Sequence, residues 1–251
     1  MNRILLKILI ITAMTSGACS TGSMKHQLPL EEERTILNTN EDGKGPQIIV
    51  EFKKGESFYY PLFAIWLEDQ SGNYLQTLYV AKSVATGFFE YAVQEGNRWK
   101  SGYRRAPQTL PYWAHKRGIQ ASDGLYVPDK SSSVPDAYSG ATPVRGFVLN
   151  SRADGPLPRK FRVMLEVNQN WDWNDYWTND KFPDDKNYLM SCQPAVVYEA
   201  LVDMENRGAS YTMKAIGHSH YSGQTGELFN DLSTLTTALK IAASVSVTVK
   251  D

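Results

Sequence analysis

The sequence is poor in cysteine and in long apolar runs, and both features limit the structures that it can form. It contains two cysteines in 251 residues, Cys19 and Cys192. Cys19 lies in an N-terminal segment that we expect to be processed on export, so Cys192 would have no intramolecular partner and no disulfide would stabilise the fold. We therefore expect an ordinary hydrophobic core in which Cys192 is a small buried residue. Beyond the N-terminal segment, no apolar run is long enough to cross a bilayer as a helix.

An excess of charge of one sign and the common catalytic motifs are also missing. The chain has 26 basic and 27 acidic residues, for a net charge of −1, and its basic clusters are no longer than the pairs at 104–105 and 116–117. This balance argues against nucleic-acid binding. The sequence contains no G-x-S-x-G elbow, no H-E-x-x-H and no phosphate-binding glycine loop. We therefore predict no catalytic residues, and a metal-dependent hydrolase stays open only as an alternative.

What the chain does contain begins with an export signal. Arg3 and Lys7 make the start basic, an apolar run occupies most of 4–14, and three small residues precede Cys19. This arrangement resembles a bacterial lipoprotein signal, which implies that Cys19 becomes a lipidated first residue. It departs from the usual pattern because Ser16 stands where leucine is commonest. The alternative is simple secretion, with cleavage just before Cys19.

The remaining chain divides into a tether and one domain. Residues 20–46 are polar and show no periodicity, which predicts a flexible tether between membrane and domain. Residues 47–251 are enough for a single domain. We expect an export signal over 1–19, a tether over 20–46 and a β-sandwich domain over 47–251. The protein would then lie on the periplasmic or outer-surface face, anchored to a membrane by its lipid.

Alternating polarity predicts strands through most of the domain. The turn at 68–72 joins two of them into a hairpin. At the C-terminus, apolar residues recur at every second position from Leu239 to Val249, which is typical of a strand with one buried face. A helix over 232–243 is the alternative, which the threonines and valines disfavour. The predicted strands cover 47–52, 62–67, 72–81, 145–149, 160–167, 194–201, 210–216 and 239–249.

One short helix is predicted in the long connection from 81 to 144. Thr109 would cap it, Pro111 suits its first turn and Gly118 would end it. Many short strands separated by turns predict an all-β fold, an immunoglobulin-like β-sandwich with a short helix in a long loop. Long loops on a rigid sandwich commonly carry function.

The long connection also contains the most informative motif, Asp-Ala-Tyr-Ser-Gly-Ala-Thr at 136–142, which has the form D-x-x-S-G-A-T. Gly140 permits a tight backbone, Ala141 adds no bulk beside the threonine, and Pro143 fixes the direction in which the chain leaves. These features suit a hydroxyl nucleophile presented to another enzyme. The alternative is an ordinary Ser-Gly surface turn.

This heptapeptide resembles the acceptor motif at which flavin transferases attach FMN to a protein threonine through a phosphoester. The resemblance implies a covalent FMN on Thr142. It also implies that Asp136, Ser139, Gly140 and Ala141 help to form the attachment site. The implied partners are a flavin transferase and a membrane electron donor or acceptor. The function to expect is extracytosolic electron transfer, in which the protein acts as a redox carrier.

The chain as a whole resembles a bacterial periplasmic family of unassigned function, loosely labelled after the immunoglobulin-like domain of the flagellar hook-capping protein. The resemblance covers most of 47–250 and implies a sandwich fold in an extracytosolic setting. The matching stretches are A-I-W-L-E-D at 64–69 with Gly72, L-P-Y-W-A-H-K-R-G at 110–118, the heptapeptide with Pro143, Q-P at 193–194 and G-H-S-H at 217–220.

Other residues are candidates for roles beside the flavin or in place of it. Trp113 and His115 are candidate flavin contacts, and His115, Lys116 or Arg117 would tune the flavin if it lies close by. The alternative is a metal site with three histidine ligands, His115, His218 and His220. We do not expect this site, because the sequence alone does not bring His115 close to the other two. The aspartate and asparagine side chains between 172 and 185 offer oxygen ligands for calcium. Their spacing is not that of an EF-hand loop, so we do not expect a calcium site.

A loop rich in aromatic residues supports a different function. Trp171, Trp173, Tyr176 and Trp177 lie among aspartates and asparagines. Their rings would stack on a flavin, on a sugar or on a protein partner, or they would pack as a lid over one end of the sandwich. The competing function is therefore a non-enzymatic exported binding module that uses this loop for a glycan or a protein.

Overall fold

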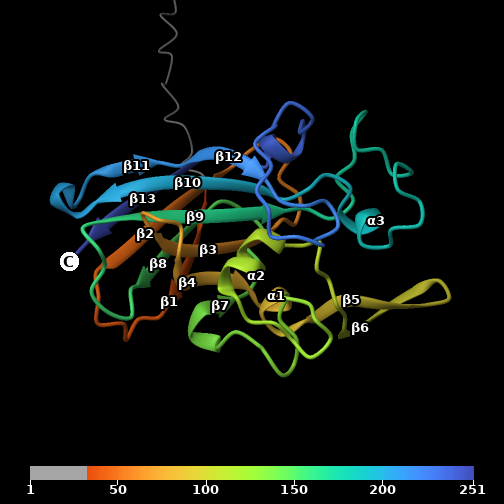
Figure 1. The fold of residues 1–251 in the computed structure, drawn as a ribbon, viewed down its shortest axis with the longest axis horizontal. Helices are drawn as coiled ribbons and strands as arrows, with labels where there is room; N and C mark the ends of the chain where they lie inside the picture. The colour runs from red at the N-terminus through yellow and green to blue at the C-terminus, as the bar shows by residue number, and fades with distance from the viewer. Residues whose placement is uncertain (1–32) are drawn as a thin grey trace, which may run out of the picture. The chain divides into compact units, whose positions relative to one another are not determined.

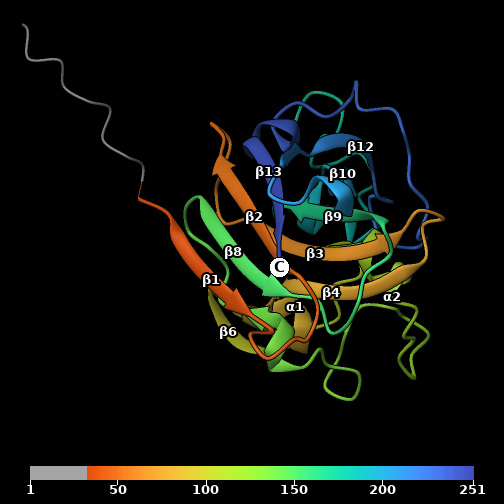
Figure 2. The ribbon, with the colours of Figure 1, turned by 90° about the vertical axis from the view of Figure 1, so that its left-hand side faces the viewer.

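The structure, a computed structural model, describes residues 33–251. The predicted signal, Cys19 and the first part of the predicted tether lie outside the described residues. From Glu33 onward the chain is mostly β, with two sheets packed in a sandwich-like arrangement (Figures 1 and 2). The all-β prediction is confirmed at this level. Within 33–251, no helix has the length and apolar character needed to span a membrane.

The first sheet has five strands in the order β1-β8-β2-β13-β11. Its pairs are antiparallel except for β1 and β8, which run parallel. The bounds are β1 Thr35–Thr39, β8 Phe147–Arg152, β2 Gln47–Lys54, β13 Ala242–Lys250 and β11 Ser210–Thr212.

The second sheet has six strands in the order β12-β10-β9-β3-β4-β7. The predicted hairpin is present as the antiparallel pair β3 and β4, whereas β4 and β7 run parallel. The bounds are β12 Lys214–His218, β10 Val196–Asp203, β9 Lys160–Asn168, β3 Leu62–Asp69, β4 Tyr74–Ala81 and β7 Ser139–Gly140.

The six-stranded sheet is covered on both faces, which explains why β3 is apolar at nearly every position. Phe63, Ile65 and Leu67 enter the core between the two sheets. Ala64 and Trp66 point to the opposite face and pack in a second core. Buried residues of α1 (Lys82–Thr86) and α2 (Pro111–Arg117) complete that second core. A strand buried on both faces carries a continuous apolar run instead of an alternating one.

The helix predicted near 109–117 is present as α2, with a different start. Leu110 occupies the N-cap position and no side chain caps the helix, so Thr109 does not have the predicted role. Gly118 ends the helix as predicted, in the left-handed conformation at φ 73°. Its N–H donates to the carbonyl of His115 at 3.0 Å. That conformation favours glycine, which has no Cβ to clash.

The predicted tether is wrong over its second half. Residues 35–39 form β1, which pairs with β8 in register from Thr35↔Phe147 to Thr39↔Ser151. The domain therefore begins at Glu33 and not at 47. The segment is polar because β1 is an edge strand in which only Thr39 is buried and the other side chains are partly or fully exposed. Polar composition alone therefore did not distinguish an edge strand from a tether.

Three further elements differ from the prediction. The long connection contains a ribbon, β5 (Phe88–Glu95) paired with β6 (Arg98–Tyr103), besides its helices. The single strand predicted at 210–216 is two strands in different sheets, β11 and β12. The start of the predicted C-terminal strand is a 3-10 helix, η3 (Ala238–Lys240), and β13 follows it. The other short helices are α3 (Tyr188–Ser191), η1 (Asp136–Tyr138) and η2 (Met204–Asn206).

Cys192 is a free, buried cysteine, as predicted. Burial raises the pKa of its thiol to about 11, so at neutral pH it is protonated and a poor nucleophile. Among the described residues, the core thus depends on sheet packing and not on a disulfide.

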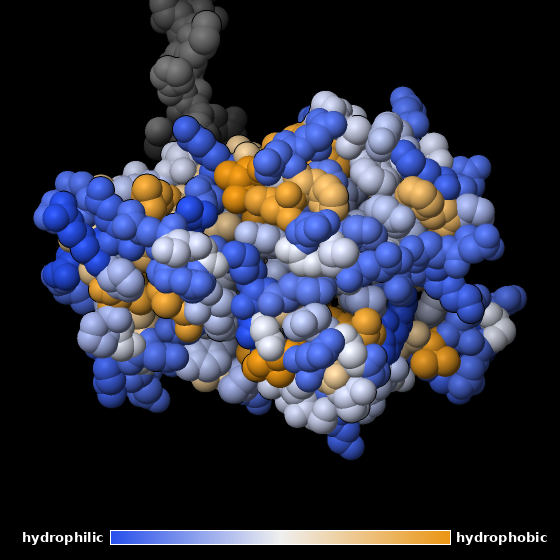
Figure 3. All heavy atoms as spheres, viewed as in Figure 1, coloured by the Kyte–Doolittle hydropathy of each residue, from blue (hydrophilic) through white to orange (hydrophobic). Residues whose placement is uncertain are grey.

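On the face shown in Figure 3, apolar side chains lie in separate patches among hydrophilic ones.

Candidate functional site

The heptapeptide 136–142 lies at an edge of the six-stranded sheet (Figure 1). Its first three residues form η1 and the next two form β7. The pairing of β7 with β4 is only two residues long, with Val80 opposite Ser139 and Ala81 opposite Gly140. Thr142 follows β7 after one residue, Ala141, and is partly exposed. No side-chain hydrogen bond of Thr142 forms within residues 33–251.

Tyr79 of β4 holds the heptapeptide against the sheet. Its hydroxyl donates to the carbonyl of Ala141 at 2.9 Å, with the carbonyl of Gly140 at 3.4 Å. A Cβ at residue 140 would come within 3.1 Å of the Tyr79 ring. Glycine at this position is thus explained by close packing. Burial raises the pKa of Tyr79, so its hydroxyl is a donor at physiological pH.

The start of the heptapeptide is braced by the segment after β1. The N–H of Asn40 donates to the carbonyl of Ala137 at 2.8 Å. The hydroxyl of Tyr138 and the side-chain amide of Asn40 both donate to Oδ1 of Asp154, each at 2.8 Å. Burial, followed by the bond to Asp154, raises the pKa of Tyr138 to about 12. This brace could not be predicted from the sequence, because Asn40 lies in the stretch predicted as tether.

The side chains of the heptapeptide differ in accessibility. The side chain of Asp136 is 82% exposed and its Oδ1 lies 3.4 Å from Nζ of Lys82. Ala141 is exposed. The hydroxyl of Ser139 is buried and has no hydrogen-bond partner among the described residues. In this conformation Asp136 and Thr142 are accessible to another protein, whereas the hydroxyl of Ser139 is not.

A hollow of about 240 Å³ adjoins the heptapeptide on the side of Tyr138. Arg117, at the end of α2, lines it together with Tyr74 and Tyr138. Nη2 of Arg117 donates to the carbonyl of Ser132 at 2.6 Å, whereas Nη1 is buried and has no partner among the described residues. Desolvation by burial lowers the pKa of Arg117. The hollow therefore contains a cation with an unused donor.

The predicted flavin contacts Trp113 and His115 do not line this hollow. Trp113 is fully buried, and its Nε1 donates to Oγ1 of Thr77 at 3.0 Å. Its ring is part of the second core, so we correct its assignment to a core residue. Nδ1 of His115 lies 2.8 Å from the carbonyl of Pro111, and its ring lies 4.3 Å from that of Tyr126. These contacts give His115 a structural role on α2.

His218 and His220 pack against aromatic rings. His218 stacks on Phe229 at 5.4 Å, and His220 stacks on Tyr221 at 4.4 Å between ring centroids. Burial lowers the pKa of His220. Within 33–251, no group of three or more histidine, cysteine, aspartate or glutamate side chains is placed to hold a metal ion.

The aromatic loop at 171–177 is divided between surface and core. Trp177 is buried and its Nε1 donates to Oγ1 of Thr234 at 3.1 Å. Trp171, Trp173 and Tyr176 are 50%, 55% and 53% exposed. Nζ of Lys181 lies 3.3 Å from the centroid of the Tyr176 ring. One ring thus closes this end of the sandwich, as a lid would, and the other three face solvent.

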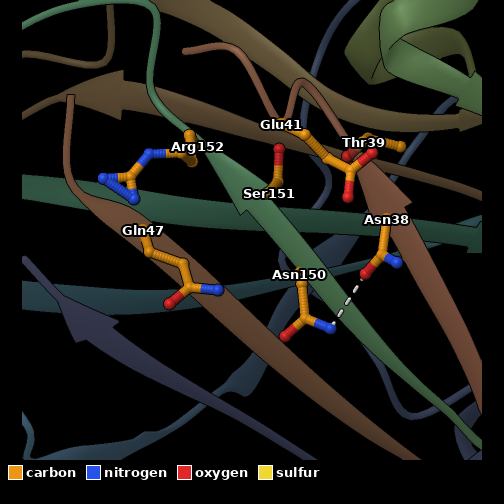
Figure 4. Close-up of a pocket in the computed structure, with 7 residues that line it drawn as sticks. All are labelled: Asn38, Thr39, Glu41, Gln47, Asn150, Ser151 and Arg152. Atoms are coloured by element: carbon orange, nitrogen blue, oxygen red, sulfur yellow. Dashed lines mark hydrogen bonds between the residues drawn. The ribbon is translucent and has the colours of Figure 1, made fainter. Parts of the chain in front are cut away.

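A polar hollow of about 340 Å³ lies over β1, β8 and the start of β2 (Figure 4). Asn150 donates to Oδ1 of Asn38 at 3.1 Å, and Ser151 points away from Asn150. Because the Ser151 hydroxyl is buried without a partner, it has no base beside it to activate it. This hollow carries no recognisable catalytic arrangement.

No family model, no curated protein and no solved structure matches this chain.

Proposed function

We propose that this protein is an extracytosolic electron-transfer flavoprotein with FMN attached through a phosphoester to Thr142. The observation that carries the proposal is the D-x-x-S-G-A-T heptapeptide, which lies at a sheet edge with Asp136 and Thr142 accessible. The residues fit an attachment site. The Thr142 hydroxyl makes no competing hydrogen bond within the described chain, and Gly140 lets the backbone lie against Tyr79.

Attachment requires a nucleophilic hydroxyl and a transferase that supplies FAD. In the proposed step, Oγ of Thr142 attacks the phosphorus of the FMN half of FAD, and AMP leaves with the electrons of the broken P–O bond. The proton of the hydroxyl passes to a base of the transferase. Asp136 would contribute to recognition, because its side chain is the most exposed charge in the heptapeptide and its partner Lys82 is also exposed.

The heptapeptide must reach the active site of a second enzyme, and its weak attachment to the sheet suits this. Only two residues of β7 pair with β4, and the buried Ser139 hydroxyl has no partner. An unsatisfied buried hydroxyl costs roughly 1–3 kcal/mol. Detaching β7 therefore costs less than detaching a fully bonded strand. The bond from Tyr79 to Ala141 would break, as would the bonds that brace Ala137 and Tyr138.

Arg117 is our candidate for a residue that influences an attached flavin. Thr142 is four residues from Tyr138. The distance between their Cα atoms is therefore at most about 13 Å, at roughly 3.3 Å per residue of extended chain. Arg117 lines the hollow next to Tyr138 and has an unused buried donor. The flavin supplies two-electron chemistry when bound, and a nearby cation stabilises its reduced, anionic form. We assign this tuning role to Arg117.

The location and partners follow from the proposed function. Cys19 would hold the protein on a membrane, where a membrane electron donor or acceptor exchanges electrons with it. Covalent attachment suits a compartment outside the cytoplasm, where a lost flavin cannot be replaced easily. We also propose that the sandwich is immunoglobulin-like, which its two packed and mainly antiparallel sheets support. An experimental structure compared with immunoglobulin-like domains tests this assignment.

The direct test is to co-express the chain with a flavin transferase and to look for flavin fluorescence on the denatured band. The wild-type band is expected to fluoresce and the Thr142→Ala band to be dark, with unchanged thermal stability. Ser133→Ala, an exposed hydroxyl just before the heptapeptide, is the matched control and should label normally. A dark wild-type band, with a transferase that labels a known acceptor, would refute the assignment.

A further inference from the structure

An aromatic cleft lies apart from the heptapeptide, where the loop before β3, strand β5 and the loop after β9 meet. It encloses about 400 Å³. Its aromatic lining consists of Tyr59, Tyr60, Tyr91 and Trp171, which are 74%, 64%, 62% and 50% exposed. Single exposed rings are common on protein surfaces, but four around one cleft form a surface suited to a ligand.

Two of these rings are presented by unusual backbone. Tyr60 has φ 55° and Trp171 has φ 57°, both in the left-handed region. This region is unfavourable for residues other than glycine, and a bulky residue there costs on the order of 1–3 kcal/mol. Such conformations cluster at ligand-binding sites, where the surrounding structure holds them. Here they turn two large rings into the same cleft.

Hydrogen bonds from the loops hold the walls of the cleft in place. The side chain of Gln169, which is buried, accepts from the N–H of Tyr59 at 2.6 Å and donates to the carbonyl of Ser57 at 3.1 Å. It therefore links the loop before β3 to the end of β9. The N–H of Trp171 donates to the carbonyl of Met190 at 2.8 Å. The rings are thus positioned before any ligand binds, which reduces the entropic cost of binding.

The charges in the cleft select the class of ligand. Its polar lining side chains are Glu90 and Asn170, and none of its lining residues is cationic. A phosphorylated ligand, FMN included, would meet a carboxylate and no positive charge. Aromatic faces with one carboxylate and one amide instead suit a neutral, hydroxylated ligand whose C–H faces cover the rings.

We propose that the cleft binds a neutral oligosaccharide. Tyr60, Tyr91 and Trp171 provide stacking surfaces for successive sugar rings, and Glu90 and Asn170 hydrogen-bond to hydroxyl groups. This site goes beyond the flavin function and does not rest on it, because it shares no residue with the heptapeptide or with the hollow at Arg117. It extends the aromatic loop at Trp171 with three tyrosines that lie far away in the sequence.

The test is isothermal titration of the full mature chain with cellohexaose, chitohexaose and maltohexaose. At least one sugar is expected to bind saturably at micromolar to millimolar concentration. Trp171→Ala and Tyr91→Ala should each weaken that binding by about tenfold or more, since stacking on one ring and its buried area are lost. Trp173→Ala is the matched control, since Trp173 is equally exposed in the same loop but does not line the cleft.

Three outcomes would overturn the proposal. In the first, none of the three sugars binds. In the second, Trp173→Ala weakens binding as much as Trp171→Ala does. In the third, a proline-rich peptide binds in place of the sugars and is lost on Tyr91→Ala, which would make the cleft a protein-docking surface. Thermal unfolding of each variant confirms that lost binding does not reflect a lost fold.

Discussion

The centre and the edge of the six-stranded sheet are held in different ways. At the centre, Glu166 of β9 is fully buried and accepts from the backbone N–H groups of Tyr112 at 3.2 Å and Trp113 at 2.8 Å. This carboxyl group joins α2 to the sheet. At the edge, β7 is held by two paired residues and by the hydroxyl of Tyr79. The difference indicates that changes at the edge alter access to Thr142 and leave the fold intact, whereas changes at the centre alter stability.

The largest expected effect is a pH dependence of stability that originates at the centre. Burial, opposed by the bonds from Trp113, Tyr112 and Ser219, raises the pKa of Glu166 to about 8, from 4.5. The folded state therefore binds more protons than the unfolded state between these values. The contribution of Glu166 to stability is largest below pH 4.5 and is lost as the pH rises through 8, by at most about 1.4 kcal/mol per pH unit.

Chemical denaturation from pH 5 to pH 9 measures this slope. Glu166→Gln removes the titrating group and should flatten the Glu166 part of the profile. The variant should also lose roughly 1–3 kcal/mol at acidic pH, because its amide nitrogen cannot accept one of the two backbone N–H groups. A profile that is the same in both proteins would show that Glu166 does not titrate in this range.

A smaller effect is expected at the edge. Tyr79→Phe removes the hydroxyl that holds Ala141, at a cost of about 1 kcal/mol. If detachment of β7 limits the reaction, flavin attachment to Thr142 should become up to about fivefold faster, since 1 kcal/mol corresponds to such a factor. The initial rate of labelling by the transferase is the measurement.

Tyr198→Phe is the control for this change. Tyr198 is also a buried tyrosine, but it lies on β10, which β9 and β3 separate from β4. Its loss of a hydroxyl should leave the labelling rate unchanged. Slower labelling of Tyr79→Phe than of the wild type would mean that the transferase recognises the heptapeptide in its sheet-bound form.

The smallest effect concerns the proposed flavin and not the fold. Arg117→Gln removes the cation beside Tyr138, so the reduced, anionic flavin loses stabilisation and its reduction potential should fall. A fall on the order of 30 mV corresponds to about 1.4 kcal/mol for a two-electron couple. Spectroelectrochemical titration measures it. Arg105→Gln, which breaks a surface pair with Asp123 at 2.7 Å, is the control and should leave the potential unchanged.

Much of the strand content could be predicted because it depends on neighbouring residues. Alternation placed β2 and β9, the turn at 68–72 joined β3 to β4, and Gly118 marked the end of α2. The burial of Cys192 followed from its apolar character and its lack of a partner. The heptapeptide was visible in the same way, since its residues are contiguous, and Thr142 as a flavin site stays a prediction.

Only the tertiary structure decided which residues meet. It paired β1 with β8, moved Trp113 into the core, and placed Arg117 and Asn40 beside the heptapeptide. It also gathered tyrosines near 60 and 91 around Trp171. The physical reason is that a local pattern shows only which face of an element is buried. Three other things depend on contacts between residues far apart in the chain. These are the pairing of strands, the choice of which tryptophan is buried and which is exposed, and the set of residues that line a cleft.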